Sequence, residues 1–138
     1  MLNVLITDDH WIVRQGLRQI LEESAEIGII DEAENGTELF ERIHARDYHL
    51  ILLDISLPGK SGLELLKEIK IIKPEILVII ISIYPEDQYA VSAIKSGASG
   101  YITKGRAADE LIPAISEVIK GGSYFSGEFI RPMASEQN

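Results

Sequence analysis

The sequence predicts an α/β protein built on a doubly wound, five-stranded parallel sheet. Short apolar runs alternate along the chain with longer segments whose apolar residues recur at helical spacing. Turn-forming residues separate these segments. Five strand–helix units result, and alternation at this spacing is typical of parallel strands with helices on both faces.

The first two units each consist of an apolar strand followed by a helix. Strands are expected at residues 2–7 and 27–33, both rich in apolar residues. Helices are expected at residues 10–23 and 37–46, because apolar residues recur there every three or four positions. The inward positions are Val13, Leu17, Ile20, Leu21, Leu39, Phe40 and Ile43.

The third and fourth strands are expected at residues 49–53 and 76–82. The latter begins with six consecutive apolar residues, as expected for a strand covered on both faces. Between them, Ser61 is followed three residues later by a glutamate, which is the pattern of a capping box. The helix it begins is expected over residues 61–73, because Pro74 ends it.

The last part of the pattern contains two helices and one strand. The helices are expected at residues 86–96 and 108–120, and the strand between them at residues 99–103. Gly97 marks the end of the first helix. Pro113 lies inside the second, so we expect it to kink this helix or to disrupt its first turns.

Composition excludes several classes of protein. The chain has 138 residues and no cysteine, which excludes a disulfide scaffold, thiolate metal sites and a cysteine nucleophile. Its longest apolar run is far shorter than the ~18–20 residues of a membrane span. The N-terminus lacks the basic region of a signal peptide, so we expect a cytoplasmic protein that does not bind membranes. The 22 acidic and 13 basic residues give a net charge of −9, which argues against nucleic-acid binding by these residues.

Polar side chains stand where the expected strands end. Asp8 and Asp9 follow the first strand, Asp54 follows the third, Ser82 ends the fourth and Lys104 follows the fifth. Because the carboxyl ends of parallel strands meet at one sheet edge, these groups are expected to converge. Three carboxylates repel one another unless a cation neutralises them, and oxygen ligands of this kind favour Mg²⁺.

This set of groups predicts phosphoryl chemistry. A carboxylate such as that of Asp54 can attack phosphorus to form an aspartyl phosphate. The metal and Lys104 would neutralise the transferred phosphoryl group, and Ser82 would donate a hydrogen bond to it.

Each residue also has a plainer explanation. Paired acids often cap a helix, a strand tyrosine such as Tyr101 usually packs in a core, and a loop lysine is usually solvated. Five such groups at strand ends in this order favour the functional interpretation. The histidines show no metal-binding spacing and are expected to be structural or solvated: His10, His44 and His49.

Four sequence blocks carry a resemblance to a known family. In order they are LITDDH, LLDISLPGKSG, VIIISIY and ASGYITK. Together they resemble the receiver domain of bacterial two-component response regulators, over residues 1–122. The resemblance implies a CheY-like, flavodoxin-like fold with strand order 2-1-3-4-5. ASGYITK, an apolar helix and GGSYFS are similar to the NarL/FixJ subfamily, whose receiver precedes a LuxR-type helix-turn-helix domain.

The resemblance implies a metal site around the phosphoacceptor. Asp54 matches the phosphoacceptor, and Asp9 and Asp54 match the direct carboxylate ligands of Mg²⁺. Asp8 matches the acid that acts through water. Ser56 matches the position whose backbone carbonyl binds the metal. Trp11 lies close by in the sequence, so we expect its fluorescence to respond to Mg²⁺.

The resemblance also implies a switch. Ser82 and Lys104 match the groups that contact the phosphoryl group, and Tyr101 matches the aromatic residue that turns inward on activation. The fourth helix, fifth strand and fifth helix match the output surface. The chain is then a switch rather than a turnover enzyme, although it catalyses its own phosphorylation and slow dephosphorylation.

Partners follow from the same resemblance. A sensor histidine kinase is the expected phosphodonor, and activation is expected to produce a homodimer. Residues 123–138 are expected to be a linker or frayed end that leads to a DNA-binding domain outside this sequence. The alternative is a stand-alone receiver that acts through protein–protein contacts.

Three rival functions fit the residues less well. An aspartyl-phosphate phosphatase needs a second aspartate two residues after the nucleophile, where this chain has Ser56. A flavin-binding module needs a phosphate loop rich in hydroxyls and glycine after the first strand, where this chain has two acids. A receiver that only binds a partner does not need the complete set of acids, hydroxyl and lysine.

Overall fold

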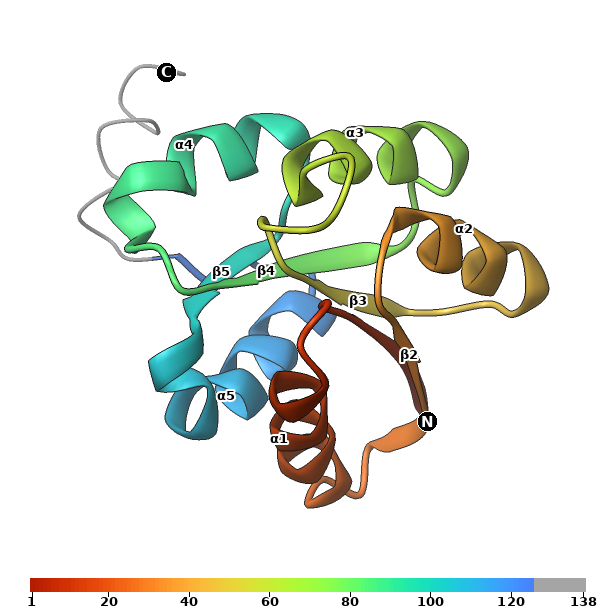
Figure 1. Ribbon diagram of the computed structural model, residues 1–138. Helices are drawn as coiled ribbons and strands as arrows, with labels where there is room; N and C mark the ends of the chain where they lie inside the picture. The colour runs from red at the N-terminus through yellow and green to blue at the C-terminus, as the bar shows by residue number, and fades with distance from the viewer. Residues whose placement is uncertain (126–138) are drawn as a thin grey trace.

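Five parallel strands form a single sheet in the order β2-β1-β3-β4-β5 (Figure 1). The computed structural model describes residues 1–125. The predicted fold class and strand order are confirmed. The strands are β1 (Leu2–Thr7), β2 (Ile27–Ala33), β3 (Leu50–Leu53), β4 (Leu77–Ser82) and β5 (Gly100–Thr103).

Helices cover both faces of this sheet. In Figure 1, α1 and α5 lie on one face, and α2, α3 and α4 lie on the other. Each helix and strand begins and ends within one residue of its predicted bounds. The helices are α1 (Trp11–Glu22), α2 (Gly36–Ala45), α3 (Gly62–Ile72), α4 (Glu86–Ser96) and α5 (Ala107–Ile119), with a short 3-10 helix η1 (Lys104–Arg106) before α5.

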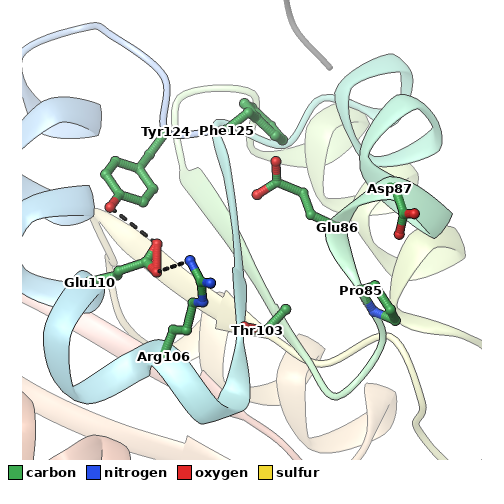
Figure 2. A pocket seen from close by; sticks show the side chains of 8 residues that line it. All are labelled: Pro85, Glu86, Asp87, Thr103, Arg106, Glu110, Tyr124 and Phe125. Atoms are coloured by element: carbon green, nitrogen blue, oxygen red, sulfur yellow. Dashed lines mark hydrogen bonds and ion pairs between the residues drawn. The ribbon is translucent and has the colours of Figure 1, made fainter. Parts of the chain in front are cut away.

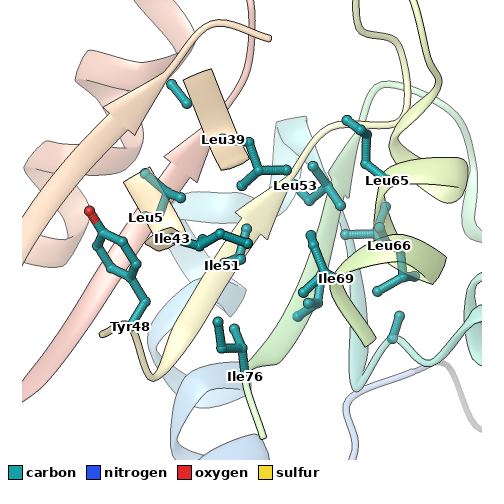
Figure 3. Packing of buried hydrophobic residues seen from close by; sticks show 14 of the residues in the cluster. Leu5, Leu39, Ile43, Tyr48, Ile51, Leu53, Leu65, Leu66, Ile69 and Ile76 are labelled. Atoms are coloured by element: carbon teal, nitrogen blue, oxygen red, sulfur yellow. The ribbon is translucent and has the colours of Figure 1, made fainter. Parts of the chain in front are cut away.

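The apolar run of β4 divides its side chains between the two faces. Val78 and Ile80 belong to the core under α2, α3 and α4, which Figure 3 shows in part. Ile79 and Ile81 belong to the second core, under α1 and α5. All four side chains are buried, because successive residues of a strand point to opposite faces. This arrangement confirms that the strand is covered on both sides.

Pro113 does not disrupt the first turns of α5, which was one of the two effects expected of it. The helix runs from Ala107 to Ile119 through the proline. Proline removes the hydrogen bond to the carbonyl of Asp109, four residues earlier. Both residues lie on the exposed side of the helix, where water can bond to this carbonyl. The buried face of α5 therefore continues unbroken.

The chain turns back onto the sheet after α5. Tyr124 forms a parallel bridge with Gly100, its N–H donates to Ser99 at 2.9 Å, and its carbonyl accepts from Tyr101 at 3.0 Å. Figure 2 shows its hydroxyl directed at Glu110, with an O–O distance of 3.2 Å. The first residues of the expected linker are thus attached to the edge of β5. The remainder of that prediction, residues 126–138, lies outside the described residues.

None of the helices within residues 1–125 has the length and apolar character needed to cross a bilayer.

Candidate functional site

Four charged side chains meet at the carboxyl edge of the sheet. Lys104 Nζ lies 2.8 Å from Asp8 Oδ2 and 3.1 Å from Asp54 Oδ2. One ligand atom from each of Asp8, Asp9, His10 and Asp54 lies within 4.8 Å of the others. Asp8 and Asp54 are buried, whereas Asp9 is exposed. The structure therefore brings together the three acids and the lysine that the sequence placed at strand ends.

Backbone contacts place Asp54 at this edge. Its N–H donates to the carbonyl of Thr7 at 3.0 Å, so the end of β3 is joined to the end of β1. Gly62, the first residue of α3, packs directly against the Asp54 backbone. A Cβ at position 62 would lie 2.0 Å from the Asp54 carbonyl oxygen. Only glycine permits this approach of α3 to the end of β3.

Burial and neighbouring charges oppose each other at Asp54. Burial and the charge of Asp8 raise the pKa of Asp54, while Lys104 acts in the lowering direction without cancelling them. Burial lowers the pKa of Lys104, but the carboxylates of Asp8 and Asp54 outweigh it and hold the pKa above its ordinary value. Lys104 is therefore a persistent cation between two buried acids.

These residues fit a hard divalent cation. Lys104 Nζ contacts the buried Asp8 at 2.8 Å and the buried Asp54 at 3.1 Å, so one positive charge faces the carboxylates of this cluster. Carboxylates this close repel one another, and a divalent cation would offset the negative charge that one ammonium leaves. Together, Asp8, Asp9 and Asp54 form an acidic cluster able to bind a metal, with oxygen donors of the kind Mg²⁺ prefers.

Ser56, predicted to offer its carbonyl to the metal, lies next to Asp54, the predicted phosphoacceptor. Its backbone N–H donates to Asp54 Oδ1 at 3.3 Å. This bond holds the loop after β3 close to the acidic cluster.

The two predicted switch residues share one backbone partner. Ser82 is fully buried, and its Oγ accepts from the N–H of Tyr84 at 3.1 Å. Tyr101 is also buried, and its hydroxyl donates to the carbonyl of Tyr84 at 2.9 Å. Tyr101 thus occupies the inward position that the resemblance associates with activation. The backbone of Tyr84, in the loop after β4, joins the two side chains.

His10, expected to be structural or solvated, is 63% exposed, and it also contacts the acids of the site. Its Nδ1 lies 3.1 Å from Asp8 Oδ1 and 3.2 Å from Asp9 Oδ1, and its N–H donates to Asp8 Oδ1 at 2.8 Å. Its position directly after two acids was the available signal.

Arg14 is a second residue that the sequence analysis did not identify. It lies on the buried face of α1 with Leu17 and Leu21, and its Nη1 donates to the carbonyl of Asp8 at 2.7 Å. A charged residue at an inward helical position was the signal, because a charge is rarely buried without a specific partner.

Comparison with known proteins identifies the family. A family model described as the response regulator receiver domain matches residues 4–116. The chain therefore belongs to the response regulator receiver domain family. Among solved structures, the isolated receiver domain of RcsB from Salmonella enterica serovar Typhimurium, determined with the phosphomimetic BeF3⁻, is similar. Its TM-score is 0.85 at 28% identity, covering 94% of this chain and 96% of that one.

Curated relatives support the predicted subfamily. The response regulator UvrY of Escherichia coli O6:H1 is 34% identical over 99% of this chain and 63% of its own length. The response regulator GacA of Pseudomonas aeruginosa is 29% identical over 97% of this chain and 63% of its own length. A LuxR-family response regulator structure from Aurantimonas sp. SI85-9A1 has a TM-score of 0.87 at 27% identity, covering 99% and 98% of the two chains. The resemblance to NarL/LuxR-type regulators is thus confirmed. The chain spans about 63% of the length of these curated relatives.

Proposed function

We propose that this chain is a phosphorylation-dependent switch that accepts a phosphoryl group on Asp54. The observation that carries this proposal is the position of the Asp54 carboxylate, which is buried beside Lys104 and Asp8 at the carboxyl edge of the sheet. Its position next to a persistent cation suits a nucleophile that must approach an anionic phosphoryl group.

The proposed phosphodonor is a phosphohistidine on a sensor kinase. An Asp54 carboxylate oxygen attacks phosphorus, and a P–O bond forms as the P–N bond breaks. The electron pair of the broken bond stays with the imidazole nitrogen, which takes a proton from solvent. By resemblance to the family, Asp9, Asp54 and the Ser56 carbonyl would hold Mg²⁺ directly and Asp8 would support it. When bound, the ion would supply positive charge that stabilises the phosphoryl group.

Lys104 and Ser82 carry the proposed response to phosphorylation. Lys104 already contacts Asp54, so a small movement lets its ammonium pair with a phosphoryl oxygen. If Ser82 turns toward the phosphoryl group, its Oγ leaves the N–H of Tyr84. Because Tyr101 is bonded to the carbonyl of the same residue, the change at Ser82 reaches Tyr101. The result is a shift between two packings.

The output surface is proposed to be α4, β5 and α5. Tyr101 lies on β5, and a change there alters the affinity of this surface for a second receiver, which gives a homodimer. The chain acts as a cytoplasmic switch and not as a turnover enzyme.

We propose that DNA binding belongs to a domain after residues 123–138. One solved relative is an RcsB–DNA complex, with a TM-score of 0.85 at 28% identity, covering 94% of this chain and 66% of that one. A stand-alone receiver is the alternative.

Intact mass spectrometry after incubation with Mg²⁺ and acetyl phosphate tests the proposal. The wild-type chain should gain one phosphoryl group as acetate leaves with the electron pair of its bond to phosphorus. Asp54→Asn should gain none, and omission of Mg²⁺ should slow the reaction strongly. An Asp54→Asn chain that is phosphorylated like the wild type would refute the assignment of the nucleophile.

A further inference from the structure

We infer that Arg14 is a positioning residue for the acidic site, because it holds the backbone from which Asp8 and Asp9 project. This inference rests on the proposed Mg²⁺-dependent function and adds a residue outside the predicted ligand set. Arg14 belongs to α1, and it contacts the site through a main-chain atom rather than a carboxylate of the cluster.

The contacts of Arg14 join the ends of two strands. Its side chain is 6% exposed. Nη1 donates to the Asp8 carbonyl at 2.7 Å, and Nε donates to Glu32 Oε1 at 2.8 Å. Nη2 lies 3.5 Å from Glu34 Oε1. A planar guanidinium bonds several acceptors in fixed directions, which a single ammonium cannot do.

The Asp8 carbonyl lies where the sheet no longer constrains β1. The pairing of β1 with both neighbouring strands ends at Thr7. The Asp8 N–H still bonds to the carbonyl of Ala33 at 3.1 Å, but its carbonyl bonds to Arg14 instead of a strand. This carbonyl belongs to the peptide group between Asp8 and Asp9. The guanidinium therefore fixes the orientation of the peptide that links the two predicted metal-binding acids.

Arg18 provides a matched comparison. It also lies on α1, and its Nε donates to Glu32 Oε2 at 2.9 Å. Its second bond is to the carbonyl of Ile30 at 2.9 Å, away from the site. Loss of either arginine therefore removes a hydrogen bond to Glu32. Only loss of Arg14 removes the hydrogen bond to the Asp8 carbonyl.

Charge and position make opposite contributions to Mg²⁺ binding. Removing a cation near three acids makes their surroundings more negative, which on its own would tighten binding of Mg²⁺. Losing the orientation of the ligands weakens binding, and loss of an outer contact typically costs on the order of 10-fold or more in metal affinity. If an Arg14 variant binds Mg²⁺ more weakly, the cause is therefore the lost orientation of the acidic ligands and not the lost positive charge.

The experiment measures Mg²⁺ affinity by calorimetric titration for the wild type, Arg14→Met, Arg14→Lys and Arg18→Met. We expect the dissociation constant to rise on the order of 10-fold in Arg14→Met. Arg14→Lys keeps the positive charge but loses the planar guanidinium that bonds several acceptors, so its dissociation constant should rise less. It replaces Arg14→Met in the test if that variant does not fold. Arg18→Met should stay within about twofold of the wild type, even where its melting temperature falls equally.

An Arg14→Met chain that is folded by circular dichroism and binds Mg²⁺ as tightly as the wild type, or more tightly, overturns the inference. So does an equal loss of affinity in Arg18→Met, because the effect would then come from Glu32. Failure of the proposed function gives a different result, since the wild type itself would then show no Mg²⁺ binding and no phosphorylation by acetyl phosphate.

Discussion

The ammonium of Lys104 lies 3.1 Å from Asp54 Oδ2, in an ion pair whose side chains are 14% and 2% exposed. The same ammonium also contacts the buried Asp8. One cation therefore offsets two buried carboxylates, so removing it takes from both the ammonium that pairs with them. Removing one partner of a buried ion pair typically costs about 3–5 kcal/mol.

Lys104→Met should accordingly destabilise the protein in the presence of EDTA by about 3 kcal/mol. Mg²⁺ should restore much of this loss, because it supplies positive charge to the same acids. Urea unfolding with EDTA and with Mg²⁺ measures both effects. Lys60→Met is the control, since it breaks an exposed ion pair with Glu68 and should change stability little in either condition. Equal stability of Lys104→Met and the wild type in EDTA would contradict the electrostatic argument.

Asp54→Asn should raise the melting temperature in EDTA. The pKa of Asp54 is raised by burial and by Asp8, so its ionised form is disfavoured in the folded state. An acid whose folded pKa exceeds its unfolded value destabilises the fold as pH rises through that range, and asparagine removes this penalty. Differential scanning calorimetry at pH 7 measures the change. The variant should also lose most of the stabilisation by Mg²⁺. A melting temperature in EDTA below that of the wild type would be evidence against an unfavourable Asp54 carboxylate, disfavoured by burial and by repulsion from Asp8.

Glu32 should make stability depend on acid pH. Burial raises the pKa of Glu32, but hydrogen bonds from Arg14 and Arg18 outweigh it and hold the pKa below the ordinary value of 4.5. A depressed folded pKa stabilises the fold above the unfolded pKa, and this contribution is lost as pH falls through the folded pKa. The difference in unfolding free energy between the wild type and Glu32→Gln should therefore be largest at pH 7 and decrease below about pH 4.5.

Urea unfolding from pH 7 to pH 3 provides this measurement. Glu41→Gln, at an exposed position of α2, removes the same charge and is the control. A constant difference between wild type and Glu32→Gln across the range would show that the ion pairs of Glu32 do not stabilise the fold.

Gly62→Ala should damage both stability and phosphorylation. The new methyl group would meet the Asp54 carbonyl, so α3 or the end of β3 must move. We expect a loss of about 1–3 kcal/mol, typical of overpacking, and slower phosphorylation by acetyl phosphate. Gly16→Ala is the control: within residues 1–125, apart from its chain neighbours and the nearby backbone of its own helix, its methyl group would meet no atom within 4 Å. In the interior of α1 it should stabilise the protein by about 0.5–1 kcal/mol.

Tyr101→Phe removes the hydrogen bond to the Tyr84 carbonyl and should cost about 1 kcal/mol. Ser82→Ala removes the bond to the N–H of the same residue. Because both bonds hold one loop residue and the two side chains also interact with each other, a double-mutant cycle by urea unfolding should give a coupling energy of about 0.5 kcal/mol or more. Additive effects would indicate that the two side chains are not coupled.

The strands, the helices and the convergence of the acids were predictable from local patterns. Runs such as residues 76–81 can be buried on both faces only in a parallel sheet covered by helices, so their order along the chain implies the topology. Topology then places Asp8, Asp54 and Lys104 at one edge, because all parallel strands end on the same side. This part of the site depends on the periodicity of apolar residues and on strand direction, and short stretches of sequence are enough to predict both.

Contacts between distant segments were not predictable in this way. The bond from Arg14 to Asp8, the approach of Gly62 to Asp54 and the pairing of Tyr124 with β5 depend on how complete elements pack. No local pattern specifies which carbonyl a buried guanidinium will reach or which edge a returning chain will join. Those choices follow from the distances and directions that exist only once both cores are packed, since each partner is brought within bonding distance by a different element.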